Sequence, residues 1–364
     1  MNPPITELEE PIAPVAPAST PAPARTAVAP LPVPELPPRV LLDLVTDCNL
    51  KCPMCIVHGG TDDPRLKDFL KKSMTVENAR QVLDELVAAK PLMMPGMWSE
   101  PLMNPNFKEH ITQMKQRGLT VAMNTNGLKI NEDMAKFLVD IKFDSVFVSV
   151  DATTSETLLK VRGIKRLDLL HQAVARLMTA RGDRPHPRIG VSMTLQAVNR
   201  HERDAFVEFW TPRVDAVRIG EIYEAGHFSG FVAAGERVPC PSLYSTLAVN
   251  TNGNVSLCCL DGFNEYNMGN VFKDGVKGVW HGPKFTSMRR LHERGQWDKI
   301  PICKTCDRWS SYQYEDLVRD GLLVRRTAEY TYYNRIDRLQ NWHKELHGTH
   351  GDPAVKLKES AVVS

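Results

Sequence analysis

The most informative residues in this 364-residue chain are its eight cysteines. Three of them, Cys48, Cys52 and Cys55, form a C-x3-C-x2-C motif directly after an apolar run. Three thiolates on one loop can bind three irons of a cubane [4Fe–4S] cluster and leave the fourth iron without a protein ligand. An open coordination position distinguishes a chemically active metal site from a structural one. A zinc knuckle with His58 as its fourth ligand is the alternative.

The other five cysteines lie in the last third of the chain, at positions 240, 258, 259, 303 and 306. Cys240 and Cys258 flank an Asn-Gly turn signal, and a C-x2-C pair, Cys303 and Cys306, follows far downstream. Four thiolates from such a hairpin and a distant pair can enclose one metal centre. A four-cysteine zinc ribbon is the alternative, and the neighbouring Cys259 could replace Cys258 as the ligand. This clustering favours metal binding over a disulfide framework.

The secondary-structure elements that must position the first motif can be predicted from the sequence around it. Short apolar runs alternate with segments in which apolar residues recur at helical spacing. Six strands are predicted by the runs at 40–45, 92–97, 119–124, 145–150, 189–195 and 216–220. Between them, apolar residues recur at helical spacing, and the first stripe follows Thr75 as its N-cap. Repeated strand–helix units predict an α/β fold with a parallel sheet. Curled into a complete or partial barrel, such a sheet carries its chemistry at the carboxyl ends of its strands.

The remainder of the chain lacks this alternation of strands and helices. The cysteine-rich region at 235–310 contains two β-like runs, 245–250 and 254–257, whose Asn-Gly separation predicts a hairpin. Residues 311–348 are interpreted as a polar, aromatic-dotted helical segment. The Pro/Ala-rich leader at 1–38 and the tail at 349–364 are expected to be disordered. The leader cannot bury enough apolar surface to offset the entropy lost on ordering.

Composition argues against several classes of function. Lys+Arg 45 against Asp+Glu 43 gives a formal net charge of +2, which offers no polyelectrolyte face for nucleic acid. No run approaches the ~18 apolar residues that a membrane span needs. The N-terminus also lacks the basic-then-apolar plan of a secretory signal. We therefore expect a cytoplasmic protein with neither a nucleic-acid nor a membrane partner.

The three-cysteine motif after a predicted strand resembles that of the radical SAM superfamily, and the resemblance covers most of residues 39–310. It implies a partial (βα)6 barrel at 39–230 and a [4Fe–4S] cluster held by Cys48, Cys52 and Cys55. In the superfamily this cluster binds S-adenosyl-L-methionine and cleaves it to a 5′-deoxyadenosyl radical, which abstracts a substrate hydrogen atom. An iron–sulfur electron carrier and a zinc-stabilised binding module are the non-enzyme alternatives.

Four further positions resemble cofactor-binding positions of the superfamily. Residues 98–101 read Trp-Ser-Glu-Pro where relatives usually have Gly-Gly-Glu-Pro. By this resemblance Glu100 would accept hydrogen bonds from the ammonium group of S-adenosylmethionine, because a charge-assisted bond is strong and orienting. Ser149 and Arg162 would contact its ribose or carboxylate. Met54 stands where an aromatic residue often lies near adenine.

The second cysteine set resembles the SPASM/twitch extension of this superfamily. No cysteine follows Cys306, which matches the shorter twitch type with one auxiliary [4Fe–4S] cluster. The expected ligands are Cys240, Cys258, Cys303 and Cys306. Four thiolates would close this cluster and suit it to electron transfer. The spacing is similar to that of 2-deoxy-scyllo-inosamine dehydrogenases, which oxidise a secondary alcohol of an aminocyclitol.

These resemblances imply hydrogen abstraction from a hydroxyl-bearing carbon of a sugar or cyclitol, ending in dehydrogenation or epimerisation. Modification of a ribosomally synthesised peptide is the alternative. Cys259 is a candidate hydrogen-atom donor for epimerisation, or simply a small buried side chain. A low-potential electron donor such as flavodoxin or ferredoxin is the expected partner. Candidates for a general base near the end of the sixth strand are Arg218, Glu221, Tyr223, Glu224 and His227.

Overall fold

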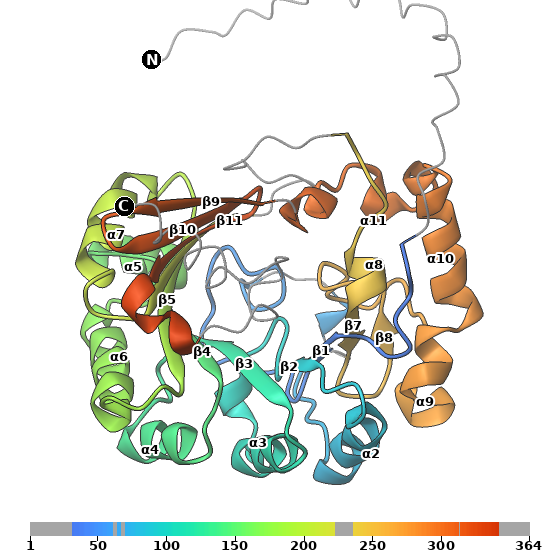
Figure 1. The fold of residues 1–364 in the computed structure, drawn as a ribbon, viewed down its shortest axis with the longest axis horizontal. Coiled ribbons are helices and arrows are strands. Elements are labelled where there is room, and N and C mark those ends of the chain that lie inside the picture. The colour runs from blue at the N-terminus through green and yellow to red at the C-terminus, as the bar shows by residue number, and fades with distance from the viewer. Residues whose placement is uncertain (1–30, 61–63, 67–69, 223–235, 313, 342–364) are drawn as a thin grey trace, which may run out of the picture.

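The computed structural model describes residues 31–60, 64–66, 70–222, 236–312 and 314–341. At its centre, six parallel strands in chain order form a curved sheet with helices on its outer side (Figure 1). The strands are β1 (Arg39–Leu42), β2 (Leu92–Met94), β3 (Thr120–Thr125), β4 (Ser145–Ser149), β5 (Arg188–Leu195) and β6 (Ala216–Glu221). The helices are α2 (Val76–Leu86), α3 (Phe107–Gln116), α4 (Glu132–Asp140), α5 (Ser155–Arg162), α6 (Leu167–Arg181) and α7 (Arg203–Trp210), with short 3-10 turns η1 (Pro101–Met103) and η2 (Arg200–Glu202). The predicted partial (βα)6 barrel is confirmed.

Side-chain caps and apolar faces explain why these helices form where they do. The Asn78 N–H donates to Thr75 Oγ1 at 3.1 Å, so the predicted N-cap of α2 is present. Asn131 and Thr154 cap α4 and α5 in the same way. The buried stripes of the helices, such as Leu83 in α2, pack against the apolar strands in one continuous core. The core thereby fixes the strand ends that carry the chemistry.

The cysteine-rich region extends the sheet at one edge. β7 (Thr246–Val249) pairs in parallel with β1, and β8 (Val255–Ser256) pairs antiparallel with β7, which confirms the predicted hairpin. An edge strand of the barrel is thus covered rather than left open. The other elements of this region are α8 (Ser242–Ser245), α9 (Val271–Trp280), α10 (Pro283–Glu293), η3 (Trp297–Lys299), α11 (Pro301–Lys304) and η4 (Arg308–Tyr312).

The prediction of a helical segment at 311–348 is wrong. The chain instead forms an antiparallel meander of β9 (Tyr314–Arg319), β10 (Leu322–Thr327) and β11 (Tyr330–Arg335), followed by η5 (Ile336–Asn341). A two-residue Asp320-Gly321 turn joins β9 to β10, and Gly321 has a φ of 74° that this turn requires. β11 pairs antiparallel with β6, so the meander extends the opposite edge of the sheet (Figure 1).

The described end of the proline-rich leader contacts the cysteine-rich region. The Trp280 indole N–H donates to the Pro34 carbonyl at 2.9 Å, and Lys277 pairs with the Glu35 carboxylate at 2.7 Å. The rest of the leader and the predicted tail at 349–364 lie outside the described residues. Among the helices in the described ranges, none is long and apolar enough to cross a membrane.

Candidate active site

The three-cysteine loop follows β1 and is held by its own backbone. The Cys55 N–H donates to the Cys52 carbonyl at 2.9 Å, and the Gly59 N–H donates to the Cys55 carbonyl at 2.8 Å. A Cβ on Gly59 would lie 2.4 Å from the Cys55 carbonyl oxygen, so a side chain there would force the loop open. Met54 is half-buried within the same turn. The loop is therefore a compact cradle that presents its thiols together.

Backbone N–H groups point at the sulfur atoms of this loop. The Leu50 N–H lies 3.4 Å from Cys48 Sγ, and the His58 N–H lies 3.3 Å from Cys55 Sγ. Such bonds stabilise thiolates that ligate iron–sulfur clusters and tune their potential. The group of His58 that contacts a thiol is its backbone N–H. Burial raises the pKa of Cys52 to about 11, so this thiol stays neutral unless a metal stabilises the thiolate.

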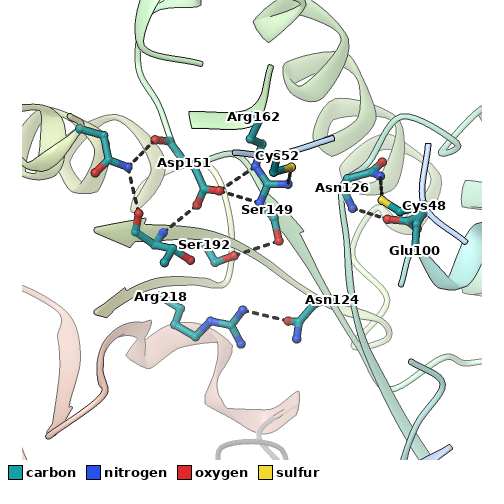
Figure 2. Close-up of polar contacts among 12 residues, drawn as sticks. Cys48, Cys52, Glu100, Asn124, Asn126, Ser149, Asp151, Arg162, Ser192 and Arg218 are labelled. Atoms are coloured by element: carbon teal, nitrogen blue, oxygen red, sulfur yellow. Dashed lines mark hydrogen bonds and ion pairs between the residues drawn. The ribbon is translucent and has the colours of Figure 1, made fainter. Parts of the chain in front are cut away.

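Glu100 lies beside the loop and is fixed by donors from the end of β3. One carboxylate oxygen accepts the Thr125 hydroxyl at 2.7 Å and the Leu102 N–H at 3.2 Å, and the other accepts the Asn126 N–H at 2.6 Å. Burial raises the pKa of Glu100, while these donors act in the opposite direction. The Asn126 amide also reaches Cys48 Sγ at 3.8 Å (Figure 2). The carboxylate and the loop are thus parts of one network.

Arg162 connects the same loop to the end of β4. Its guanidinium bonds to the Asp151 carboxylate at 2.7 and 2.6 Å and lies 4.0 Å from Cys52 Sγ. Asp151 is fully buried, directly after β4. Ser149, the last residue of β4, accepts a hydrogen bond from Ser192 of β5 at 3.4 Å. Figure 2 shows Glu100 and Asn126 beside Cys48, and Arg162 between Asp151 and Cys52. The structure therefore links Glu100 and Arg162 to the three-cysteine loop.

The second thiol set surrounds one small cavity. Its walls include apolar side chains and the four expected cysteines, Cys240, Cys258, Cys303 and Cys306. Burial raises the pKa of Cys240 to about 11 and of Cys303 to about 12, which favours neutral thiols unless a metal binds. Within the described part of the chain, no group of three or more His, Cys, Asp or Glu converges on a single-ion site. A cubane distributes its thiolates over separate irons, so its ligands need not converge on one point.

Cys259 differs from its neighbour Cys258 in its surroundings. It does not line the four-thiol cavity, whereas Cys258 does. Its carbonyl oxygen accepts a hydrogen bond from the Trp98 indole at 3.0 Å, in the segment that carries Glu100. Of these two adjacent cysteines, Cys258 alone lines a cavity with the other three expected ligands. Another cavity, inside the barrel, is lined by Arg308 and Tyr330 among other residues.

This barrel cavity has a volume of about 110 Å³. It is lined by Arg39, Met94, Asn124, Arg218, Arg308, Ser311, Tyr312, Thr327, Glu329, Tyr330 and Tyr332. Burial raises the pKa of Tyr330, although Arg218 and Arg308 act in the opposite direction. The sequence did not single out Glu329, because the meander that places it here was expected to be helical.

The structure places the five general-base candidates in different surroundings or does not describe them. Arg218 lines the cavity, but a guanidinium stays protonated and cannot accept a proton at ordinary pH. Glu221 is buried, pairs with Arg200 at 3.1 and 2.8 Å, and is not among the residues that line the cavity. Tyr223, Glu224 and His227 lie outside the described residues.

Comparison with known protein families identifies two regions of the chain. Residues 43–209 match the radical SAM superfamily, and residues 240–307 match the SPASM iron–sulfur cluster-binding domain. The chain therefore belongs to the radical SAM superfamily and is a radical SAM enzyme. Its cofactors are a [4Fe–4S] cluster with S-adenosylmethionine and an auxiliary iron–sulfur cluster.

The similar proteins of known function are named for different activities. The mycofactocin maturase MftC of Mycobacterium tuberculosis is 21% identical over 311 residues, 74% of this chain and 75% of that protein. A tungsten-containing aldehyde ferredoxin oxidoreductase cofactor-modifying protein of Pyrococcus furiosus is 28% identical over 112 residues, 30% of either chain. An S-adenosyl-L-methionine-dependent 2-deoxy-scyllo-inosamine dehydrogenase of Niallia circulans is 42% identical over 65 residues, 17% of this chain and 26% of that protein.

Solved structures share the fold. BtrN in complex with AdoMet and 2-DOIA superimposes with a TM-score of 0.52 at 16% identity, covering 76% of this chain and 94% of that one. The anSMEcpe structure with bound AdoMet has a TM-score of 0.54 at 15% identity, covering 74% and 85%. These identities support a common architecture and leave the substrate to be argued from this chain's own residues.

Proposed function

We propose that this enzyme abstracts a hydrogen atom from a hydroxyl-bearing carbon of a sugar or cyclitol and completes a dehydrogenation or an epimerisation. The observation that carries the proposal is the position of Arg308, which lines both the four-thiol cavity and the barrel cavity. A substrate in the barrel would lie one side chain away from the second thiol set. The match to a 2-deoxy-scyllo-inosamine dehydrogenase supports the same interpretation.

The cofactor site follows from the network around the first loop. When bound, the cluster and S-adenosylmethionine supply a 5′-deoxyadenosyl radical. Cys48, Cys52 and Cys55 are the proposed cluster ligands. Glu100, already oriented by Thr125 and Asn126, offers its carboxylate to the ammonium group of the cofactor. We assign the remaining contacts to Met54, Ser149 and Arg162.

The second thiol set is the proposed electron acceptor site. Cys240, Cys258, Cys303 and Cys306 would hold the auxiliary cluster with every iron ligated, as electron transfer favours. Oxidation of a secondary alcohol to a ketone removes two electrons and two protons. The abstracted hydrogen atom accounts for one of each, so one electron needs a nearby acceptor and one proton needs a base. Glu329, which forms an ion pair with Arg308, is the one carboxylate among the described residues that line the barrel cavity, and it is the proposed base.

Epimerisation requires a different last step, in which a hydrogen atom returns to the carbon from its other face. Cys259 is the proposed donor for that step: its S–H bond breaks, and the thiyl radical left behind takes up one proton and one electron from a flavodoxin- or ferredoxin-type donor. Its thiol is not among the four that line the second cavity, and its carbonyl oxygen bonds to Trp98 in the segment that carries Glu100. A Cys259→Ala variant should then cleave the cofactor without forming an epimer. If the variant still forms the epimer, Cys259 is not the donor.

Peptide modification is the second candidate function. It is favoured by the mycofactocin maturase, which matches 74% of this chain. The two candidate functions differ in which substrate should stimulate cofactor cleavage.

We assign the enzyme to the cytoplasm. Its proposed electron donor is a flavodoxin- or ferredoxin-type protein, because reduction of the first cluster requires a low-potential electron source.

The deciding experiment measures 5′-deoxyadenosine formation by the reduced, cluster-loaded enzyme in the presence of aminocyclitols, sugars and peptides. A deuterium label on the hydroxyl-bearing carbon should appear in 5′-deoxyadenosine for a true substrate. Label transfer from a peptide alone would favour the maturase function. The absence of 5′-deoxyadenosine with several chemical and protein reductants would reject the proposed function.

A further inference from the structure

Arg218 lies in the middle of β6 on the inner face of the barrel. In the sheet register it is opposite Ser192 of β5 and Tyr332 of β11, and Ser192 is opposite Ser149 of β4. Residues opposite one another in neighbouring strands project to the same face. Arg218 therefore shares the face of Ser149, a proposed cofactor contact. Figure 2 shows its guanidinium turned toward Asn124, on the side of the Ser149–Ser192 pair away from Arg162.

The contacts of this guanidinium are neutral. One of its N–H groups donates to the Asn124 side-chain oxygen at 2.9 Å. Its central carbon lies 4.9 Å from the ring centre of Phe147 and 5.3 Å from that of Tyr330. Among the residues that the structure describes, no carboxylate forms an ion pair with Arg218. A guanidinium held between aromatic faces retains N–H groups for an outside acceptor.

Arg308 provides an internal comparison. It lines the same cavity, but it forms an ion pair with Glu329, so its charge is balanced. The Arg308–Glu329 pair is balanced, so the half-buried Arg218 is a cation of this wall that has no carboxylate partner among the described residues. A partly desolvated cation gains when a ligand brings an opposite charge to it.

We propose that Arg218 binds a carboxylate or phosphate group of the substrate. The inference rests on the proposed function and adds the substrate class, which is an acidic or phosphorylated sugar or cyclitol rather than a neutral one. The planar fork of arginine matches two oxygens of such a group. With the anionic group held at Arg218, the hydroxyl-bearing carbon would lie toward Ser149 and the three-cysteine loop.

The test is calorimetric titration of the cluster-loaded enzyme with S-adenosylmethionine bound. The probes are glucuronate, glucose 6-phosphate and glucose. We expect at least one anionic sugar to bind about 10- to 100-fold more tightly than glucose, as for a charge-assisted bond. This preference should weaken as salt is added, because salt screens the attraction. The relative affinity of the two anions distinguishes a carboxylate from a phosphate as the recognised group.

Two variants make the test specific. Arg218→Gln should reduce the affinity for the anionic sugars to that for glucose. Arg213→Gln is the matched control, since Arg213 also stacks on an aromatic ring, 4.0 Å from the centre of Phe209, but on the surface. Anionic sugars that bind no better than glucose, or that bind wild type and Arg218→Gln equally, would overturn the proposal. Titration requires no turnover, so a failure to form 5′-deoxyadenosine would reject the proposed function separately.

Discussion

The indole N–H of Trp98 donates a hydrogen bond to the carbonyl oxygen of Cys259 at 3.0 Å. Trp98 belongs to the segment that carries Glu100, and Cys259 follows a thiol of the second set. A Cβ on Gly262 would lie 2.7 Å from the same indole nitrogen, so the two segments are in close contact. The segment that carries Glu100 and the segment that carries Cys258 are therefore in direct contact.

Loss of this contact should weaken both stability and cofactor binding. Trp98→Phe retains the aromatic bulk but leaves a carbonyl oxygen without its donor, which costs about 1 kcal/mol of unfolding free energy. Because Glu100 lies two residues away, the affinity for S-adenosylmethionine should fall several-fold. Denaturant unfolding and cofactor titration of the two proteins measure these effects. Unchanged cofactor affinity would show that the contact does not position Glu100.

The buried Arg162–Asp151 pair should be far more sensitive than a surface pair. Asp151→Asn leaves the buried guanidinium uncompensated, and breaking such a pair costs about 3–5 kcal/mol. The control is Asp168→Asn, which removes the exposed pair with Arg166 and should change the unfolding free energy far less, because water screens that pair. Denaturant unfolding compares the two variants. Equal losses would contradict the role assigned to the buried pair.

Close packing of Phe147 should make Gly190 intolerant of a side chain. A Cβ at Gly190 would lie 2.4 Å from the Phe147 ring, which must then shift, and this ring stacks on Arg218. We expect Gly190→Ala to cost about 1–3 kcal/mol of unfolding free energy, as overpacking does. Gly278→Ala in α9 is the control, because its nearest neighbour would lie 3.6 Å away. A Gly190→Ala protein as stable as Gly278→Ala would refute this packing argument.

Asp43 should make stability depend on pH in an unusual direction. Burial raises the pKa of Asp43 to about 7, although Ser99 and Met97 donate hydrogen bonds to it. Its pKa in the unfolded chain is about 3.9, so the folded state binds the proton more tightly. The resulting stability is fully present below about pH 4 and is lost as the pH rises to about 7.

The Asp43→Asn variant isolates this effect because it keeps the shape of the side chain and does not titrate. The unfolding free energy of wild type relative to the variant should fall between about pH 4 and pH 7 and stay level above that range. Denaturant unfolding at several pH values gives the difference. A difference that stays constant, or that rises with pH, would contradict a raised pKa.

The sequence was sufficient to predict the barrel because its strands are continuous apolar runs and its helices bury apolar stripes. The C-terminal meander was missed because its buried face is largely polar. In β10 the buried positions are Leu323, Arg325 and Thr327, so burial alternates while hydrophobicity does not. An argument from periodicity detects only an alternation of hydrophobicity, which β10 does not have. The Asp320-Gly321 turn was the signal that could have indicated the hairpin.

The candidate site also has a part that the sequence predicts and a part that only the fold reveals. Cysteine spacing predicts which thiols share a site, because local chain geometry limits where they can lie. The apposition of Arg218 and Tyr330 depends instead on the antiparallel register of β6 and β11, which are more than a hundred residues apart in sequence. No local pattern contains that register. The cavity that we propose for the substrate therefore became visible only in the fold.

Iron and zinc content per chain, measured after anaerobic purification, tests the central claim most directly. The two-site account predicts about eight irons in wild type and about four in each of two variants. One variant replaces Cys48, Cys52 and Cys55 with alanine, and the other replaces Cys240, Cys258, Cys303 and Cys306. Cys259→Ala, the control, should retain about eight irons. Zinc in place of iron at the second site, or a full loss of iron from Cys259→Ala, would contradict the account.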